Sequence, residues 1–181
     1  MNFVPVYQTG RLILRGLGER DVVPLHQIMN FPEVMRYFPN PDPPSRDRIE
    51  RLIANQIEHW NNYGYGWWAI DTKTDKKMIG WSGLQFLPET GEVEIAYLIA
   101  KPYWGQGVAT EAALLGLTFG FENSGLDRIV AIVHPENIAS QRVAQKLGMN
   151  FVDRSWYFGM ECLRYCLDCQ TFKGFERCQK K

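Results

Sequence analysis

The sequence has no excess of charge of either sign, since its 181 residues carry 20 Lys and Arg against 20 Asp and Glu. Without a basic excess, the chain does not have the electrostatic character of a general nucleic-acid binder. It also has no apolar run near the roughly 18 residues of a membrane-spanning helix, and no N-terminal apolar segment ending in a cleavage site. We therefore expect a cytoplasmic protein whose partners include neither nucleic acid nor a membrane.

Cysteine and histidine are scarce as well. The three histidines are isolated in sequence, and the four cysteines all lie in the last fifth of the chain: Cys162, Cys166, Cys169 and Cys178. That distribution matches neither a disulfide framework nor a paired zinc motif. Residues 166 and 169 have C-x-x-C spacing, but in a strand they would point to opposite faces. We expect reduced thiols and no metal site.

No internal repeat or low-complexity tract interrupts the chain. Its only break in composition is PNPDPP at 39–44, which is too short for a domain linker. The hydrophobic fraction of 45% is typical of a globular protein, and the length suits one core. Residues 1–181 are therefore expected to form a single domain.

Apolar periodicity predicts a mixed α/β fold in which helices pack on a sheet. Helices are expected at 19–30, 45–62, from 107 to a stop between Gly120 and Gly125, and at 137–147, with a short helical turn at 33–37. Ser45 is a plausible N-cap of the second helix. Strands are expected at 11–15, 67–71, 78–87, 92–99, 128–133, 151–157 and 161–171, with 67–99 forming an antiparallel meander.

The most informative segment is EVEIAYLIAKPYWGQGVATE at 92–111, which reads as a strand, a glycine-rich turn and a helix. Such a turn exposes backbone N–H groups at the positive end of a helix, where phosphate binds well. The segment lacks the Lys-Ser/Thr of a P-loop and the G-x-G-x-x-G of a dinucleotide site. By itself, the turn could equally serve only to pack the helix closely.

Residues 104–109, WGQGVA, resemble the coenzyme A pyrophosphate loop of GNAT N-acetyltransferases, whose pattern is Arg/Gln-x-x-Gly-x-Gly/Ala. Gly107 and Ala109 match the pattern, whereas Trp104 replaces the usual first residue. Three further segments resemble family elements: RLILR at 11–15, MIGWSGL at 78–84 and NIASQRVAQKLGM at 137–149. GQGVATEA and EIAYLIA are most similar to the RimJ/RimL-like ribosomal-protein alanine acetyltransferase branch, which also includes enzymes that act on small molecules.

This resemblance implies a strongly twisted, mostly antiparallel sheet of about seven strands, with a splayed parallel pair at the cofactor site and four helices over both faces. It also implies acetyl-coenzyme A as co-substrate. The pantetheine arm should pair with the backbone of Tyr97, Leu98 and Ile99. The pyrophosphate should lie on the loop and first helical turn, namely Trp104, Gly105, Gln106, Gly107, Val108, Ala109 and Thr110.

The resemblance also assigns catalytic roles that compete with simpler interpretations. Glu94 would remove the proton of the amine, although Glu92 and Glu94 could be a solvent-facing pair. Ser140 would protonate the departing thiolate, or only bond to the helix start. Asn137 would face the cofactor, but is also a favoured N-cap, and the side chain of Tyr97 would be core or cofactor wall.

The acceptor groove is expected beside the proline-rich loop and the aromatic cluster Trp60, Tyr63, Tyr65, Trp67 and Trp68, for which core packing is the alternative. We predict direct transfer of an acetyl group to a primary amine in a ternary complex, by a monomer or homodimer. The acceptor would be a protein N-terminal amine or a small-molecule amine. The alternative is a catalytically silent module that senses acyl-coenzyme A or scaffolds a partner.

Overall fold

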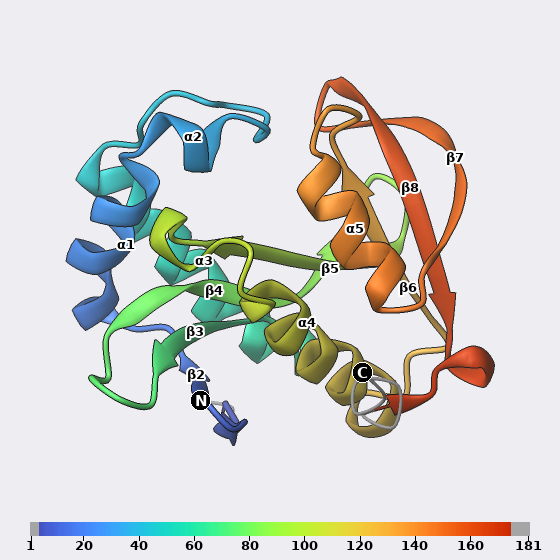
Figure 1. Ribbon diagram of the computed structural model, residues 1–181, viewed down its shortest axis with the longest axis horizontal. Coiled ribbons are helices and arrows are strands. Elements are labelled where there is room, and N and C mark those ends of the chain that lie inside the picture. The colour runs from blue at the N-terminus through green and yellow to red at the C-terminus, as the bar shows by residue number, and fades with distance from the viewer. Residues whose placement is uncertain (1–3, 175–181) are drawn as a thin grey trace.

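The computed structural model describes residues 4–174. Its centre is an eight-stranded sheet in the order β1-β2-β3-β4-β5-β6-β8-β7 (Figure 1). In chain order the strands are β1 (Tyr7–Gln8), β2 (Leu12–Gly16), β3 (Trp67–Thr72), β4 (Met78–Leu87), β5 (Glu92–Ile99), β6 (Arg128–Val133), β7 (Asn150–Tyr157) and β8 (Met160–Asp168). The predicted mixed α/β fold is confirmed, with β1 as an additional two-residue strand.

All neighbouring strands are antiparallel except β5 and β6. These two parallel strands are in register at a single pair, Glu94 with Val130. Beyond that pair they diverge, so that β2–β5 and β6–β8 form two wings (Figure 1). The predicted splayed parallel pair is present, and Glu94 lies where the wings meet.

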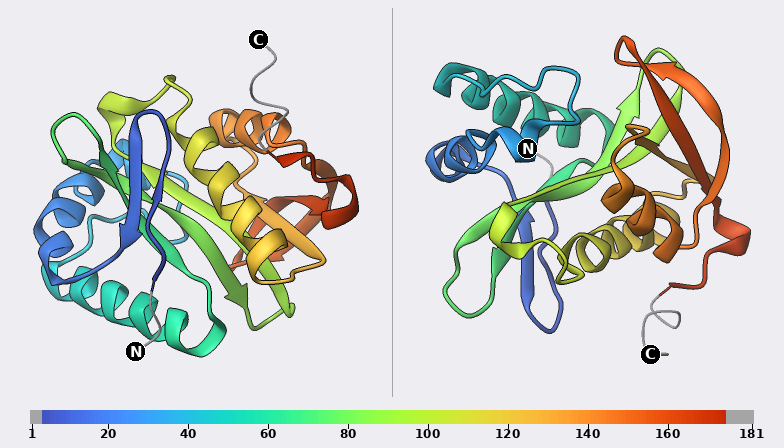
Figure 2. Two further views of the ribbon diagram at one scale, coloured as in Figure 1. Left: turned by 90° about the horizontal axis from the view of Figure 1, so that it is seen from below. Right: turned by 45° about the horizontal axis from the view of Figure 1, so that its top comes forward.

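Helices cover both faces of the sheet: α1 (Val22–Met29), α2 (Pro32–Met35) and α3 (Arg46–Tyr63) on one, α4 (Val108–Thr118) and α5 (Ile138–Lys146) on the other (Figure 2). Alternate residues of β5 separate two apolar clusters, because successive side chains of a strand point to opposite faces. Ile95 and Ile99 pack with α4, whereas Leu98 packs with α1 and the first half of α3. Within residues 4–174, no helix is long and apolar enough to span a membrane.

One predicted boundary is wrong, for an identifiable reason. The last strand does not reach residue 171, because its partner β6 begins at Arg128 and the final pair is Arg128 with Asp168. The helix that begins at 108 ends between Gly120 and Gly125, as predicted, after a π-helical turn over Phe119–Asn123. A Cβ on Gly120 would lie 2.7 Å from Cδ1 of Ile129, so this glycine allows close packing.

Candidate active site

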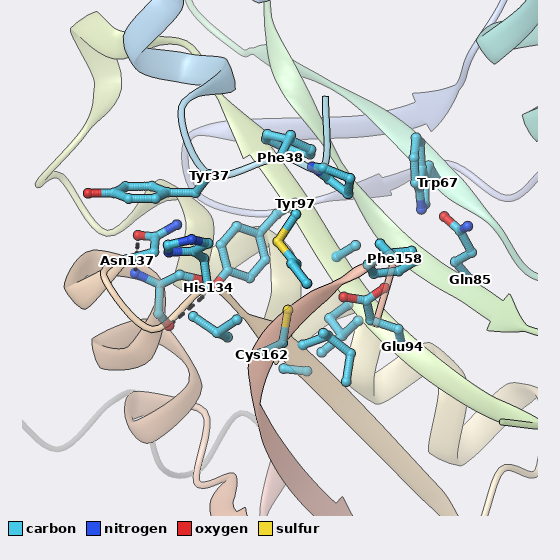
Figure 3. Close-up of a pocket in the computed structure, with 18 of the residues that line it drawn as sticks. Tyr37, Phe38, Trp67, Gln85, Glu94, Tyr97, His134, Asn137, Phe158 and Cys162 are labelled. Atoms are coloured by element: carbon cyan, nitrogen blue, oxygen red, sulfur yellow. Dashed lines mark hydrogen bonds between the residues drawn. The ribbon is translucent and has the colours of Figure 1, made fainter. Parts of the chain in front are cut away.

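A cavity of about 270 Å³ opens where β5 and β6 diverge. Its walls also come from the loop after α2, the start of α5 and the β7–β8 hairpin. Figure 3 shows two groups of side chains: Tyr37, Tyr97, His134 and Asn137 at one end, and Trp67, Gln85 and Glu94 at the other. The splay therefore forms one pocket from segments that are distant in the sequence.

Glu94 is the carboxylate of this pocket and is only 7% exposed. The predicted alternative of a solvent-facing pair is wrong: Glu92 is partly buried and accepts hydrogen bonds from Tyr157 and Arg164. Burial raises the pKa of Glu94 to about 8, against the opposing effect of a hydrogen bond with the backbone of Ile132. Near neutral pH this side chain can therefore both hold and release a proton.

Tyr97 and Ser140 meet across the splay, with 2.6 Å between Oη and Oγ (Figure 3). Burial raises the pKa of Tyr97 to about 12, although the hydrogen bond with Ser140 lowers it and the charge of Glu94 raises it. The Ser140 N–H donates to Oδ1 of Asn137, so Asn137 is the predicted N-cap of α5 and also lines the pocket. The two hydroxyls form a hydrogen-bonded pair that can donate a proton into the cavity.

The glycine-rich loop lies at the N-terminus of α4, and none of its residues lines the pocket. Gly105 and Gly107 have φ of 74° and 77°, in the left-handed region that favours glycine. A Cβ on Gly105 would meet no atom within 4 Å. No side chain caps the helix start at Gly107. This open backbone cradle fits a phosphate group, which is the test that a coenzyme A site must pass.

Within the predicted cofactor segment, Val108 is buried, Ala109 and Thr110 are partly buried on the first turn of α4, and Gln106 folds back to donate to the Pro102 carbonyl. Trp104 ties the loop to the end of β5, because its Nε1 donates to the Ile99 carbonyl at 2.7 Å.

The guanidinium group of Arg11, which sequence reasoning missed, lies beside this loop. Nε of Arg11 lies 2.6 Å from Oε2 of Glu111, which is in the first turn of α4. A Cβ on Gly107 would lie 3.5 Å from Nη2 of Arg11. The ion pair offsets the negative charge that Glu111 would otherwise bring to a phosphate site. The spacing of charged residues in the sequence does not predict this ion pair, because Arg11 and Glu111 are 100 positions apart.

The strand register shows which main-chain groups of the predicted pantetheine strand point away from β4. Ala100 donates its N–H to Ile79 across the β4–β5 ladder. Since main-chain groups alternate along a strand, Leu98 points its N–H and C=O toward β4, while Tyr97 and Ile99 face the splay. The Leu98 side chain is buried on the α1 face. Within this segment, the main-chain groups available to an added strand are therefore those of Tyr97 and Ile99, while the Leu98 side chain packs in the core.

The aromatic cluster at 60–68 separates into two groups. Trp60, Tyr65 and Trp68 belong to the apolar core, as the packing alternative expected, and Tyr63 stacks on Phe86. Only Trp67 lines the pocket. Sequence reasoning missed its neighbour Trp81, whose ring stacks on that of Trp67 with centroids 3.6 Å apart.

The hairpin tip also reaches the pocket, through Phe158 with φ of 54° and through Met160. Cys162 lines the pocket as a thiol whose pKa burial raises to about 11, which favours its neutral form. Cys162, Cys166 and Cys169 are free, and Cys178 lies outside the described residues. Across residues 4–174, no group of three or more His, Cys, Asp or Glu side chains could hold a metal ion.

A sequence profile described as "Acetyltransferase (GNAT) domain" matches residues 11–150. The N-acetyltransferase YoaA of Bacillus subtilis, named as uncharacterized, is 30% identical over 145 residues, which are 80% of this chain and 82% of YoaA. The spermidine N(1)-acetyltransferase of Escherichia coli K12 is 29% identical over 142 residues, covering 76% of this chain and 72% of that protein.

Solved structures share the fold. RimL, described as a ribosomal L7/L12 alpha-N-protein acetyltransferase in complex with coenzyme A, superposes with a TM-score of 0.76 at 20% identity, over 92% of this chain and 98% of RimL. Members of the matched family use acetyl-coenzyme A as acetyl donor. The chain belongs to the GNAT acetyltransferase family and is an acyltransferase that acts on amines.

Proposed function

We propose that this protein acetylates a primary amine by direct transfer in a ternary complex, with Glu94 as general base and Ser140 as general acid. The observation that carries the proposal is the arrangement of one pocket: a buried carboxyl at the base of the splay and a pair of hydroxyls on its wall. The acceptor would be the α-amine of a polypeptide or a small molecule, as in the RimJ/RimL-like branch.

Bound acetyl-coenzyme A supplies the acetyl group as a thioester, so an N–C bond forms and a C–S bond breaks. Starting from the ammonium form of the acceptor, two protons leave nitrogen, and the carboxylate of Glu94 would take the first, because only a neutral amine has a free lone pair. The Ser140 hydroxyl, hydrogen-bonded to Tyr97, would give a proton to sulfur, and the second proton from nitrogen would restore that hydroxyl. The backbone N–H groups at Gly105–Thr110 would hold the pyrophosphate, with Arg11 beside them.

The raised pKa of Glu94 supports an α-amine as acceptor. An α-amine has a pKa of about 7.7–8, close to the value of about 8 for Glu94, whereas a lysine amine is near 10.4. With matched pKa values, a proton is shared almost evenly between the two groups. In a pocket where charge is costly, this favours the neutral acid beside the reactive free amine.

The test is the release of free coenzyme A thiol from acetyl-coenzyme A across a panel of amines and short peptides. Turnover with at least one amine supports the enzyme, whereas binding of acetyl-coenzyme A without turnover by any amine supports the sensor. Acetyl-coenzyme A should also raise the melting temperature far more than ATP or NAD. An equal shift with ATP would contradict a loop specific for coenzyme A.

We further propose a single domain over residues 1–181, in the cytoplasm, as a monomer or homodimer.

A further inference from the structure

Two tryptophans that line the same pocket have indole N–H groups without a protein partner. Trp67 and Trp81 are 9% and 2% exposed, and within residues 4–174 their Nε1 atoms are the buried side-chain nitrogen or oxygen atoms that lack a hydrogen bond. Both residues line the pocket, and their rings lie parallel within 7°. Folded proteins rarely leave a buried donor unpaired, because the lost contact with water is not recovered.

The other buried indoles are satisfied, which makes this pair unusual. Nε1 of Trp60 donates to the Trp67 carbonyl at 3.0 Å, and Nε1 of Trp68 donates to the Pro5 carbonyl at 2.9 Å. The fold therefore provides acceptors for indoles in the core. Among residues 4–174, the buried indole donors left unpaired are the two on pocket-lining residues, where a bound molecule can supply the acceptor.

The strand register places this pair close to Glu94. Gln85 stands opposite Glu94, and one step along the same face Gly83 stands between Ala96 and Trp67. Two residues along a strand span roughly 7 Å. Gly83 and Ala96 have little or no side chain, so little side-chain volume separates the Glu94 carboxyl from the indoles of Trp67 and Trp81. Figure 3 shows the Trp67 nitrogen at the end of its ring nearest Gln85 and Glu94.

The remaining chemistry of the pocket does not suit a polycation. Glu94 is the only carboxylate among its lining residues, which also include Phe38, Phe158 and Met160. A second ammonium group of a polyamine would find no second carboxylate among these residues to pair with its charge. An oxygen acceptor on the same molecule would satisfy the two donors.

We infer that Trp67 and Trp81 donate hydrogen bonds to an oxygen of the acceptor, so that the preferred acceptor is an α-aminoacyl group, as in a peptide N-terminus or an amino-acid amide, and not a polyamine. This inference rests on the proposed function, because it assumes that the amine is held at Glu94. It names the pair as specificity-determining residues that bind the substrate away from the reacting atoms.

A pair of acceptors that differ only in the oxygen-bearing group tests the inference. L-leucinamide and 3-methylbutylamine share an amine and a branched apolar chain, but only the first has a carboxamide. With kcat/KM expressed per neutral amine, leucinamide should be favoured by about 10-fold or more, since each hydrogen bond to a buried donor is worth a few-fold to about tenfold. Spermidine should be the poorest of the three. Equal or better turnover of 3-methylbutylamine or spermidine would overturn the inference.

Variants locate the effect on the indole nitrogens. Trp67→Phe and Trp81→Phe remove the N–H and keep an aromatic ring, so each should lower kcat/KM for leucinamide about 5-fold or more and leave 3-methylbutylamine within about 2-fold. Trp68→Phe is the matched control: it removes the indole N–H of the adjacent residue, which bonds to Pro5 on the other face. It should not change the ratio of the two acceptors. Equal losses for both acceptors in the pocket variants would show that the indoles only pack.

A binding measurement keeps the inference testable if no amine is turned over. The chain has six tryptophans, so its ¹H–¹⁵N spectrum has six indole signals, and the Phe variants assign those of Trp67, Trp68 and Trp81. Leucinamide added with coenzyme A should move the Trp67 and Trp81 signals, whereas 3-methylbutylamine should not. Movement of these signals without turnover would support the inference and contradict the proposed enzyme. Unmoved signals together with turnover would contradict the inference alone.

Discussion

The two ends of the candidate site differ in whether backbone groups or side chains form them. At the α4 end, the chain offers backbone: a left-handed glycine at each of positions 105 and 107, and a helix start without a side-chain cap. At the pocket end it offers side chains, with Glu94 from β5, Trp67 from β3 and Phe158 from the β7–β8 hairpin. The first end is contiguous in sequence, and the second is assembled from the whole fold.

Because of this difference, one end of the site can select the acetyl donor and the other end can select the acceptor. A backbone cradle binds phosphate by geometry and helix dipole, so it suits one donor and tolerates changes in neighbouring side chains. A wall of side chains can distinguish acceptors, because each group contributes its own size and hydrogen-bonding capacity. Substitutions at the two ends should therefore have separable effects on donor affinity and on turnover.

The largest effect is expected at Glu94. Glu94→Gln removes the base but keeps the size of the side chain, so kcat/KM should fall by about 100-fold or more. With an alkylamine of pKa near 10, wild-type kcat/KM should rise to pH 8 and then level off, because Glu94 is by then ionised. The variant should continue to rise toward pH 10, so the loss should shrink above pH 8.

Glu92→Gln is the control for this comparison, since Glu92 lies two residues away on the same strand face and is held by Arg164. It should change kcat/KM by less than about threefold, on a scale where positioned proton transfer is worth at least 100-fold. Measured pH profiles of kcat/KM for both variants decide the matter. A loss at Glu94→Gln as small as that of the control would mean that water removes the proton.

At the opposite end, Gly107→Val should weaken acetyl-coenzyme A binding by about 10- to 100-fold, since a branched side chain would stand in the phosphate cradle. Valine at φ of 77° also strains the backbone. Gly91→Val is a control with similar strain, at φ of 72° in the β4–β5 turn with no atom within 4 Å of the added Cβ. Calorimetric titration of folded variants should show weak binding only for Gly107→Val. Unchanged affinity would mean that the phosphates bind elsewhere.

Most of the fold could be predicted, because its signals are local. Ser45 accepts from the Arg48 N–H as an N-cap should, and Asn137 does the same for Ser140. The β1 strand was missed because two residues, Tyr7 and Gln8, carry too little periodicity. The end of β8 depends on where β6 begins, which the sequence of β8 does not contain.

The site shows the same limit. The loop at 104–107 is contiguous, so a motif predicted where it would lie. The Trp67–Trp81 stack, the approach of Arg11 to Gly107 and the contact of Tyr97 with Ser140 join residues that are 14 to 96 positions apart. These contacts follow from strand register and helix packing, which one sequence without a fold does not determine. Glu94 was chosen from resemblance, and only its burial explains why its pKa suits a base.

A smaller effect is expected at the hydroxyl pair. Ser140→Ala and Tyr97→Phe should each lower kcat by about 10- to 100-fold with little change in acetyl-coenzyme A affinity. Because the two oxygens lie 2.6 Å apart, the kcat of the double variant should be little lower than that of the less active single variant. Unlike the loss at Glu94, these losses should persist at high pH, since the sulfur still needs a proton. Additive losses would show that the two hydroxyls act independently.

The smallest effect concerns stability and pH. Burial raises the pKa of Glu94 from 4.5 to about 8, so the folded state holds a proton that the unfolded state has lost at pH between these values. Stability should therefore fall as pH rises from about 4.5 to about 8, by an amount on the order of a few kcal/mol. Glu94→Gln removes this dependence, so the melting temperature of the variant relative to wild type should increase by several degrees between pH 5 and pH 8.5. Glu89→Gln, at an exposed position in the β4–β5 turn, should show no such trend. Thermal denaturation of all three proteins across this range measures it. A constant difference for Glu94→Gln would mean that this carboxyl ionises in the folded protein as easily as in water, and would remove the physical basis for its role as a base near neutral pH.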